Sequence, residues 1–155
     1  MDLKPGDKAP KFRLAADAGG EVSTATLKGK PFVLYFYPKD DTTGCTKEAI
    51  GFSESLKKFD ALGVSVIGVS KDSTASHDRF KAKYKLKIAL ASDPETKTAA
   101  DYGVWVEKSM YGRTYLGMER STYLVDAKGV IQHVWRKVKV AGHVEDVLAQ
   151  AKKLA

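Results

Sequence analysis

PFVLYFYPKDDTTGCTKEAIGF, residues 31–52, changes from a continuous apolar run to a polar segment and then to apolar residues at helical spacing. Residues 31–36 predict a strand buried on both faces of a sheet, because no polar residue alternates with the apolar ones. A loop is expected from Pro38 to Gly44, and a helix is expected to begin near Cys45. The apolar positions of that helix are Ala49, Phe52, Leu56 and Phe59, and Gly63 is expected to end it.

The rest of the chain adds strands and helices on both sides of this unit. In the first half, strands joined through helices predict parallel pairing, and in the second half a short turn between two strands predicts antiparallel pairing. We therefore predict an α/β, thioredoxin-like fold, with a mixed central β-sheet flanked by helices and an N-terminal β-hairpin extension, in a single domain of residues 1–155. The other expected elements are a hairpin over 11–24, a strand over 64–70, a helix over 74–85, a strand around 88–91, a helix from Asp93 to Gly103, a loop or ribbon over 111–117, a hairpin over 121–135 and a last helix with Val144, Val147, Leu148 and Ala151 on one face.

The composition is that of a globular protein, with 155 residues, 43% hydrophobic and 29% charged. The chain has one cysteine, so it cannot form an internal disulfide, which fits a reducing compartment, and we expect a cytoplasmic location. The first ten residues contain charges and two prolines where a signal peptide needs an apolar core. The longest apolar run is too short to span a bilayer, and we expect no membrane association.

The formal net charge is +7, and the densest basic stretch is residues 79–87. Phe80 and Tyr84 lie four residues apart in it, which is the spacing of a buried helical stripe. We expect a solvated basic helix face and no nucleic-acid binding, although nucleic acid or an acidic protein partner are the alternatives that the charge suggests.

Two interpretations of Cys45 follow from its neighbours. A free cysteine usually packs as a small buried hydrophobe. Against this, Cys45 is expected at a helix N-terminus, where the dipole and unpaired N–H groups stabilise a thiolate, and the polar loop before it predicts access from solvent. Thr42 and Thr43 add hydroxyl donors. Because a less basic thiolate is also a weaker nucleophile, efficient chemistry further requires a cation delivered from elsewhere in the fold.

Pro38-x-x-x-Thr42-x-x-Cys45, within FYPKDDTTGCTKEAIGF, resembles the signature of peroxiredoxins of the bacterioferritin-comigratory, or PrxQ, branch. The resemblance extends over nearly the whole chain, through GDKAPKF, SHDRFKAKY and GVWVEKSMYGRTYLGMERSTYLVDAKG. It implies a thiol-dependent peroxidase that reduces hydrogen peroxide and organic hydroperoxides through a sulfenic acid, with no metal, flavin or haem cofactor. A peroxide sensor or holdase chaperone, oxidised stoichiometrically at the same cysteine, is the alternative.

The resemblance also assigns roles to individual residues. Cys45 would attack the peroxide, and the Thr42 hydroxyl would hydrogen-bond both the peroxide and the thiolate. Pro38 would shape the loop and shield the thiol from water. Arg120 would pair with the thiolate and the peroxide oxygen, and so supply the cation that the chemistry requires.

Two further residues are implied less directly. Backbone N–H groups near Gly44 and Cys45 would complete the substrate pocket. Glu48 would either orient Arg120 or serve as a surface acid that favours the helix dipole.

The chain departs from this pattern where many relatives carry a second, resolving cysteine. The two positions at which relatives carry it are Ile50 and Lys81 here, and Thr43 stands where many relatives have proline. The resemblance therefore implies a one-cysteine enzyme whose sulfenic acid is reduced by an external thiol: thioredoxin, glutaredoxin or glutathione. A monomer is expected.

Other chemistry-bearing residues receive structural interpretations. The three histidines lack metal-ligand spacing and are expected to be structural or at the surface, with His77 capping a helix. The tryptophans are expected to be packing residues, and two tyrosines of the 111–117 segment stay unassigned between substrate and partner contacts. These residues are His77, His133, His143, Trp105, Trp135, Tyr111 and Tyr115.

Overall fold

The computed structural model describes residues 2–154, and within them seven strands form one sheet in the order β2-β1-β5-β4-β3-β8-β9. β3 pairs in parallel with β4, and β4 with β5, whereas the remaining pairs are antiparallel. The predicted mixed sheet is therefore confirmed. The strands are β1 (Arg13–Ala16), β2 (Glu21–Ser23), β3 (Phe32–Phe36), β4 (Ser65–Ser70), β5 (Ala89–Ser92), β8 (Ser121–Val125) and β9 (Ile131–Trp135).

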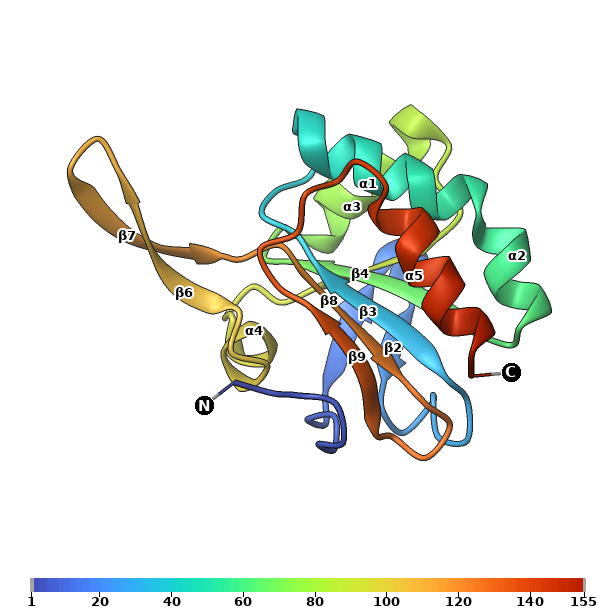
Figure 1. Cartoon of the computed structure of the whole chain (residues 1–155). Coiled ribbons are helices and arrows are strands. Elements are labelled where there is room, and N and C mark those ends of the chain that lie inside the picture. The colour runs from blue at the N-terminus through green and yellow to red at the C-terminus, as the bar shows by residue number, and fades with distance from the viewer. Residues whose placement is uncertain (1, 155) are drawn as a thin grey trace.

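Helices cover both faces of the sheet, so the central strands are buried on both sides (Figure 1). Val33 and Tyr35 of β3 pack in the cluster that includes α1, α2, α3 and α5, which we call the helix-side core. Leu34 and Phe36 pack in the opposite cluster, with α4. This explains the continuous apolar run. The helices are α1 (Thr43–Glu54), α2 (Leu56–Ala61), α3 (Thr74–Tyr84), α4 (Lys97–Asp101) and α5 (His143–Lys152).

The N-terminal hairpin joins the edge of the main sheet, because β1 pairs with β5 as well as with β2. Its turn is the short helix η1 (Asp17–Gly19). The Asp17 carboxylate accepts hydrogen bonds from Lys81 Nζ of α3 at 2.7 Å and from the backbone N–H of Leu90 at 2.8 Å. Lys81 therefore fastens the hairpin to α3, at a position where a resolving cysteine was considered.

Two predicted helices have different bounds in the structure. The helix expected from Cys45 to Gly63 is broken at Ser55, where ψ is 1°, so α1 and α2 are separate. The helix expected from Asp93 begins only after Thr96, which has a left-handed φ of 59°.

Asp93 still caps that helix, although it lies four residues before the first helical residue, Lys97. Its carboxylate accepts the backbone N–H groups of Thr98 at 3.3 Å and Ala99 at 2.8 Å, which are unpaired donors of the first turn of α4. Asp93 is therefore a real cap, but the predicted bounds were wrong: Pro94 and Glu95, expected in the first turn, precede α4, which ends at Asp101.

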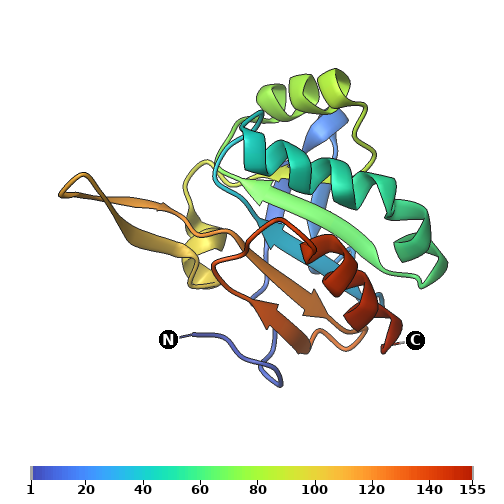
Figure 2. The ribbon, with the colours of Figure 1, turned by 45° about the horizontal axis from the view of Figure 1, so that its top comes forward.

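Residues 105–118 form a separate two-stranded sheet, β6 (Trp105–Met110) and β7 (Arg113–Met118), that extends away from the body of the molecule (Figures 1 and 2). Its turn residues Tyr111 and Gly112 both have positive φ, 52° and 76°, as a tight hairpin turn requires. The segment predicted as a loop or ribbon is thus the tip and returning strand of a ribbon. Among residues 2–154, no helix is long and apolar enough to cross a membrane.

Candidate active site

Cys45 lies in the first turn of α1, directly after the loop that leaves β3. Thr42 precedes the helix, and its carbonyl accepts the backbone N–H of Thr46 at 2.8 Å. The Cys45 side chain is 1% exposed and packs in the helix-side core. The prediction of ready access from solvent is therefore wrong for this conformation, because the side chain packs in this core and Arg120 contacts its sulfur.

Arg120 brings a cation to the sulfur from 75 residues away in sequence. It lies in the short link between β7 and β8, where its carbonyl accepts the backbone N–H of Val138 at 2.9 Å. Its Nη2 donates to Cys45 Sγ at 3.2 Å, and its Nη1 donates to Glu48 Oε1 at 2.7 Å. Burial opposes the charge on Arg120, but Glu48 and Cys45 together raise the pKa of its guanidinium. The guanidinium therefore stays charged beside the thiol.

Glu48 is fully buried, so the interpretation of this residue as a surface acid is wrong. It follows Cys45 by three residues, which places both side chains on the same face of α1. Burial raises the pKa of Glu48 to about 7, although the charge and hydrogen bond of Arg120 act to lower it. Its Oε2 has no hydrogen-bond partner among the described residues. One carboxyl oxygen thus orients the guanidinium, and the other oxygen forms no hydrogen bond within the described residues.

Gly44 allows the guanidinium to approach the start of the helix. A Cβ atom at this position would lie 3.2 Å from Arg120 Nη2, which is closer than most real Cβ contacts. Any side chain at residue 44 would press on the nitrogen that contacts Cys45 Sγ.

Thr42 and Pro38, in the loop before α1, are both exposed, unlike Cys45. The Thr42 hydroxyl donates to the Lys39 carbonyl at 2.8 Å and, among the described residues, forms no bond with Cys45. The structure thus brings Cys45, Glu48, Arg120 and Gly44 together. Thr42 and Pro38 stay at the exposed surface of the loop.

The sequence interpretation missed a buried polar network that holds this loop. Asp40 Oδ1 accepts the Tyr37 hydroxyl at 2.6 Å, and Oδ2 accepts the Ser76 hydroxyl at 2.8 Å. His77 Nδ1 lies 2.7 Å from the same Oδ2, and its Nε2 lies 2.9 Å from the Ala91 carbonyl. The ring thus bridges the Asp40 carboxyl group and the Ala91 carbonyl through its two nitrogens.

His77 does not cap α3, as was predicted, because Ser73 does so by accepting the backbone N–H of Ser76 at 3.1 Å. His77 instead lies one turn inside the helix with no exposed surface, where it can meet Asp40. In the sequence, the one indication of this network was the pair of aspartates, Asp40 and Asp41, after a buried strand.

Asp41 attaches the same loop to the far end of α3. Its carboxylate accepts Lys83 Nζ at 2.7 Å and the Tyr84 hydroxyl at 2.6 Å, and its own φ is 58°. We call the contacts of Asp40 and Asp41 with Ser76, His77, Lys83 and Tyr84 the loop clamp. They also neutralise part of the basic stretch that the sequence presents as a solvated face.

The other two histidines have structural surroundings. His143 Nε2 lies 2.8 Å from the Thr122 hydroxyl, and burial lowers the pKa of His143 to about 4. The His133 ring lies against Trp135, with centroids 4.1 Å apart.

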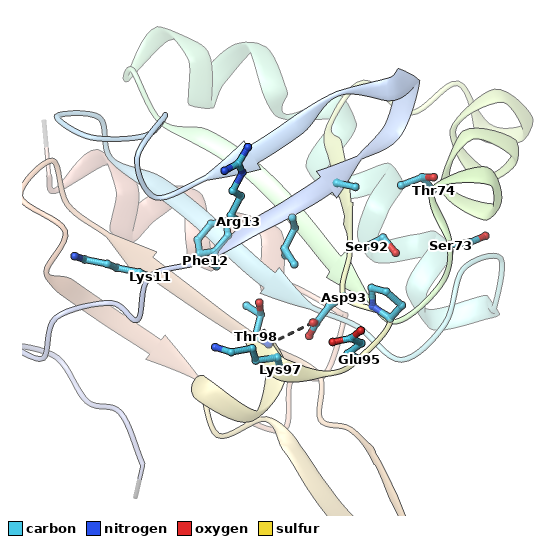
Figure 3. Close-up of a pocket in the computed structure, with 13 residues that line it drawn as sticks. Lys11, Phe12, Arg13, Ser73, Thr74, Ser92, Asp93, Glu95, Lys97 and Thr98 are labelled. Atoms are coloured by element: carbon cyan, nitrogen blue, oxygen red, sulfur yellow. Dashed lines mark hydrogen bonds between the residues drawn. The ribbon is translucent and has the colours of Figure 1, made fainter.

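A wide cleft of about 780 Å³ lies elsewhere, between β1, the start of α3 and residues 92–98 (Figure 3). Its buried carboxylate, Asp93, is already engaged by the first turn of α4. Cys45 does not line this cleft. The candidate active site is therefore identified by its chemistry and not by its volume.

Comparisons with known proteins agree on one family. The AhpC/TSA family matches residues 5–134. Peroxiredoxin Bcp of Bacillus subtilis is 44% identical over 155 residues, which cover 100% of this chain and 99% of that protein. The bacterioferritin comigratory protein of Xanthomonas campestris, solved as trapped intermediate and ligand complexes that concern its alkyl peroxide reduction activity, is 40% identical, with a TM-score of 0.89 over 99% of this chain and 97% of that one. A mutant of PrxQ from Xylella fastidiosa has a TM-score of 0.93 at 35% identity, over 99% of this chain and 98% of that one.

Proposed function

The chain belongs to the AhpC/TSA family and is a peroxiredoxin of the Bcp/PrxQ group, and from this premise we propose that Cys45 alone carries its peroxidase cycle. The substrates are hydrogen peroxide and organic hydroperoxides, and the reductant is an external thiol. The observation that carries the proposal is the Arg120 guanidinium, which contacts Cys45 Sγ and the buried Glu48 at the same time.

The oxidative half of the cycle is a displacement at oxygen. The Cys45 thiolate attacks one oxygen of the hydroperoxide, an S–O bond forms and the O–O bond breaks. Sulfur is oxidised to sulfenic acid, and the leaving oxygen takes up a proton to become water or an alcohol. Negative charge moves from sulfur to the leaving oxygen, so a fixed cation such as Arg120 stabilises both ends of this path.

The loop residues have proposed roles in binding the peroxide. Thr42 would turn its hydroxyl from the Lys39 carbonyl to the bound peroxide, and Pro38 would hold the loop over the sulfur. The backbone at Gly44 would contribute N–H groups at the start of α1, where the helix dipole favours negative charge.

The reductive half requires a thiol from outside, because the chain has a single cysteine. An external thiol displaces water from the sulfenic acid to give a mixed disulfide, and a second thiol then releases Cys45 and leaves with the oxidised reductant. Structures of the Xanthomonas relative include serine mutants of two different cysteines, which are as far apart in sequence as Cys45 and Lys81 are here. Lys81 instead forms an ion pair with Asp17.

The test is steady-state peroxide consumption with several thiol donors. We expect turnover well beyond one equivalent per chain with dithiothreitol, and with at least one of thioredoxin, glutaredoxin or glutathione. Cys45→Ser should abolish turnover and leave the midpoint of thermal unfolding unchanged. Consumption that stops at one equivalent with every donor would favour the stoichiometric sensor and overturn the cycle.

A further inference from the structure

The ribbon of β6 and β7 exposes apolar and aromatic side chains without a core of its own. It pairs with no other strand of the described chain and extends away from the body (Figures 1 and 2). Side chains of this kind, gathered on one element in an otherwise polar surface, indicate an interaction site. Their exposed fractions are 96% for Tyr111, 60% for Leu116, 56% for Met110 and 45% for Tyr115.

Strand register divides the ribbon into two faces, because residues that lie opposite each other point to the same side. Lys108 lies opposite Tyr115, Met110 opposite Arg113, and Val106 opposite Gly117. A Cβ at Gly117 would lie 3.1 Å from Lys108 Cδ and 3.4 Å from Tyr115 Cε2, so the lysine stem and the tyrosine ring lie side by side across that glycine. We call this the cationic face; it consists of Val106, Lys108, Met110, Arg113, Tyr115 and Gly117.

The cationic face leads directly to the active site. Lys108 Nζ donates to the carbonyl of Met118, two residues before Arg120. Burial lowers the pKa of Lys108, the charge of Arg120 lowers it further, and Glu119 and Cys45 act in the opposite direction. The base of the ribbon is thus within electrostatic reach of the reacting sulfur.

Further positive charge lies in the segments that carry or contact the site residues. Exposed lysines occur there at Lys39, Lys47, Lys137 and Lys139. The first two flank Cys45 in sequence, and the other two flank Val138, whose backbone N–H donates to the Arg120 carbonyl. Within residues 2–154, none of these lysines, nor Lys108 or Arg113, forms an ion pair with a carboxylate. The chain as a whole carries +7.

We propose that the cationic face, together with these lysines, docks a protein reductant that presents carboxylates around an apolar surface at its own thiol. This inference rests on the proposed function, in which an external thiol reduces Cys45. A partner that reaches Cys45 from this side also lies along the ribbon, and its negative charge meets cations that have no partner within the chain. A small thiol would need neither the exposed rings nor a surface that continues to the ribbon tip.

The experiment compares changes on the cationic face with changes elsewhere on the molecule. Arg113→Glu and Tyr115→Ser alter the cationic face outside the catalytic groups. Thr114→Glu lies on the opposite ribbon face. Lys128→Glu makes the same change in net charge as Arg113→Glu, but in the turn beyond the other end of β8.

Each variant is measured with thioredoxin and its reductase, with glutaredoxin and glutathione, and with dithiothreitol. We expect Arg113→Glu and Tyr115→Ser to raise KM about ten-fold for whichever protein donor supports the wild type, and added salt to raise the wild-type KM. Turnover with dithiothreitol and the rate of Cys45 oxidation by peroxide should stay unchanged. Thr114→Glu and Lys128→Glu should behave as the wild type.

Several results would overturn the inference. One is an unchanged KM in both face variants, and another is the same loss in Lys128→Glu. A third is wild-type turnover with glutathione alone and with neither protein donor. A concentration-dependent dimer that Tyr115→Ser abolishes, with KM unchanged, would assign the face to a second copy of this chain. Absence of wild-type turnover with dithiothreitol would contradict the proposed function itself and is distinguishable from all of these.

Discussion

The guanidinium of Arg120 performs two tasks with two different nitrogens. Nη2 contacts Cys45 Sγ at 3.2 Å and Nη1 contacts Glu48 Oε1 at 2.7 Å, so the planar group is oriented by the buried acid while it faces the sulfur. A lysine ammonium is a single point charge and cannot copy this fork.

Arg120→Lys is therefore expected to lower the second-order rate of Cys45 oxidation by about 10- to 100-fold, although the positive charge is retained. The rate is measured by stopped-flow competition for hydrogen peroxide, and the thermal unfolding curve checks that the variant is folded. An unchanged rate would contradict the role assigned to the guanidinium geometry.

Glu48 connects the site to the pH dependence of stability. Its pKa in the folded chain is about 7, against an ordinary glutamate value of 4.5. Between these values the folded chain binds more protons than the unfolded chain, so the free energy of unfolding falls as the pH rises through this window. Each unit between the two pKa values corresponds to about 1.4 kcal/mol.

Glu48→Gln removes this ionisation and keeps an oxygen that can accept from Arg120 Nη1. We expect the free energy of unfolding of this variant, measured with urea, to fall less than that of the wild type between pH about 4.5 and about 7. Parallel curves for the two proteins over this range would show that Glu48 does not titrate there.

Among the elements, those set by local pattern were predictable and those set by distant contacts were not. The apolar run of β3 and the helical spacing after Cys45 predict both elements and their order, because each depends on neighbours in sequence. The break at Ser55 and the late start of α4 after Thr96 depend on single backbone conformations that residue type does not specify. Of the active site, Cys45 follows from its place at a helix start, whereas Arg120 was identified only through the family resemblance.

The loop clamp was not predictable because it joins groups 37 residues apart, Asp40 and His77, through tertiary packing. Periodicity marks neither residue as buried and polar. Their contacts matter for function because this loop leads into α1 and thereby positions Cys45.

His77→Gln is expected to loosen this loop. The variant loses the ring that bridges the Asp40 carboxylate and the Ala91 carbonyl, and it leaves buried acceptors short of donors, at a cost of about 1–3 kcal/mol. Hydrogen exchange of peptides that cover residues 37–46 should become faster, and Cys45 should react more slowly with peroxide.

Lys83→Gln is the matched control for His77→Gln, since it breaks the exposed contact of the same clamp at Asp41. Exposed ion pairs of this kind contribute little to stability because solvent screens them, so little change is expected. If His77→Gln lowers overall stability while exchange in residues 37–46 stays as slow as in the wild type, the network does not hold the loop.

The whole molecule gathers its reactive groups where three separate parts of the chain meet. The loop after β3 supplies the thiol, α3 holds that loop, and the link from the ribbon to β8 supplies the cation. Each part is fastened at a second place, as with Lys81 and Asp17 between α3 and the N-terminal hairpin. Secondary structure could be assigned segment by segment, but this meeting point exists only in the complete fold.

The burial of Cys45 predicts the fate of the whole protein when peroxide is supplied without a thiol. A disulfide between two copies of this chain needs Cα atoms within about 7 Å, and because Cys45 is 1% exposed in each copy, the start of α1 would have to open in both copies at once. Reduction by an external thiol requires this opening in one chain only. In the proposed cycle peroxide oxidises this thiol, so peroxide reaches the sulfur more easily than a second copy of the chain does. With no resolving cysteine, the sulfenic acid should instead meet further peroxide and become sulfinic acid.

We therefore expect excess peroxide to produce a monomer that carries two added oxygen atoms on Cys45, with little covalent dimer on a non-reducing gel. Met110 is 56% exposed and also oxidisable, so the oxygen atoms are located by peptide mass spectrometry, with Cys45→Ser reporting the methionine background. Dithiothreitol added before the peroxide should preserve the unmodified thiol by intercepting the sulfenic acid. A covalent dimer as the main product would mean that α1 unwinds readily. The conformation in which Cys45 is buried would then be a minor state of the oxidised chain.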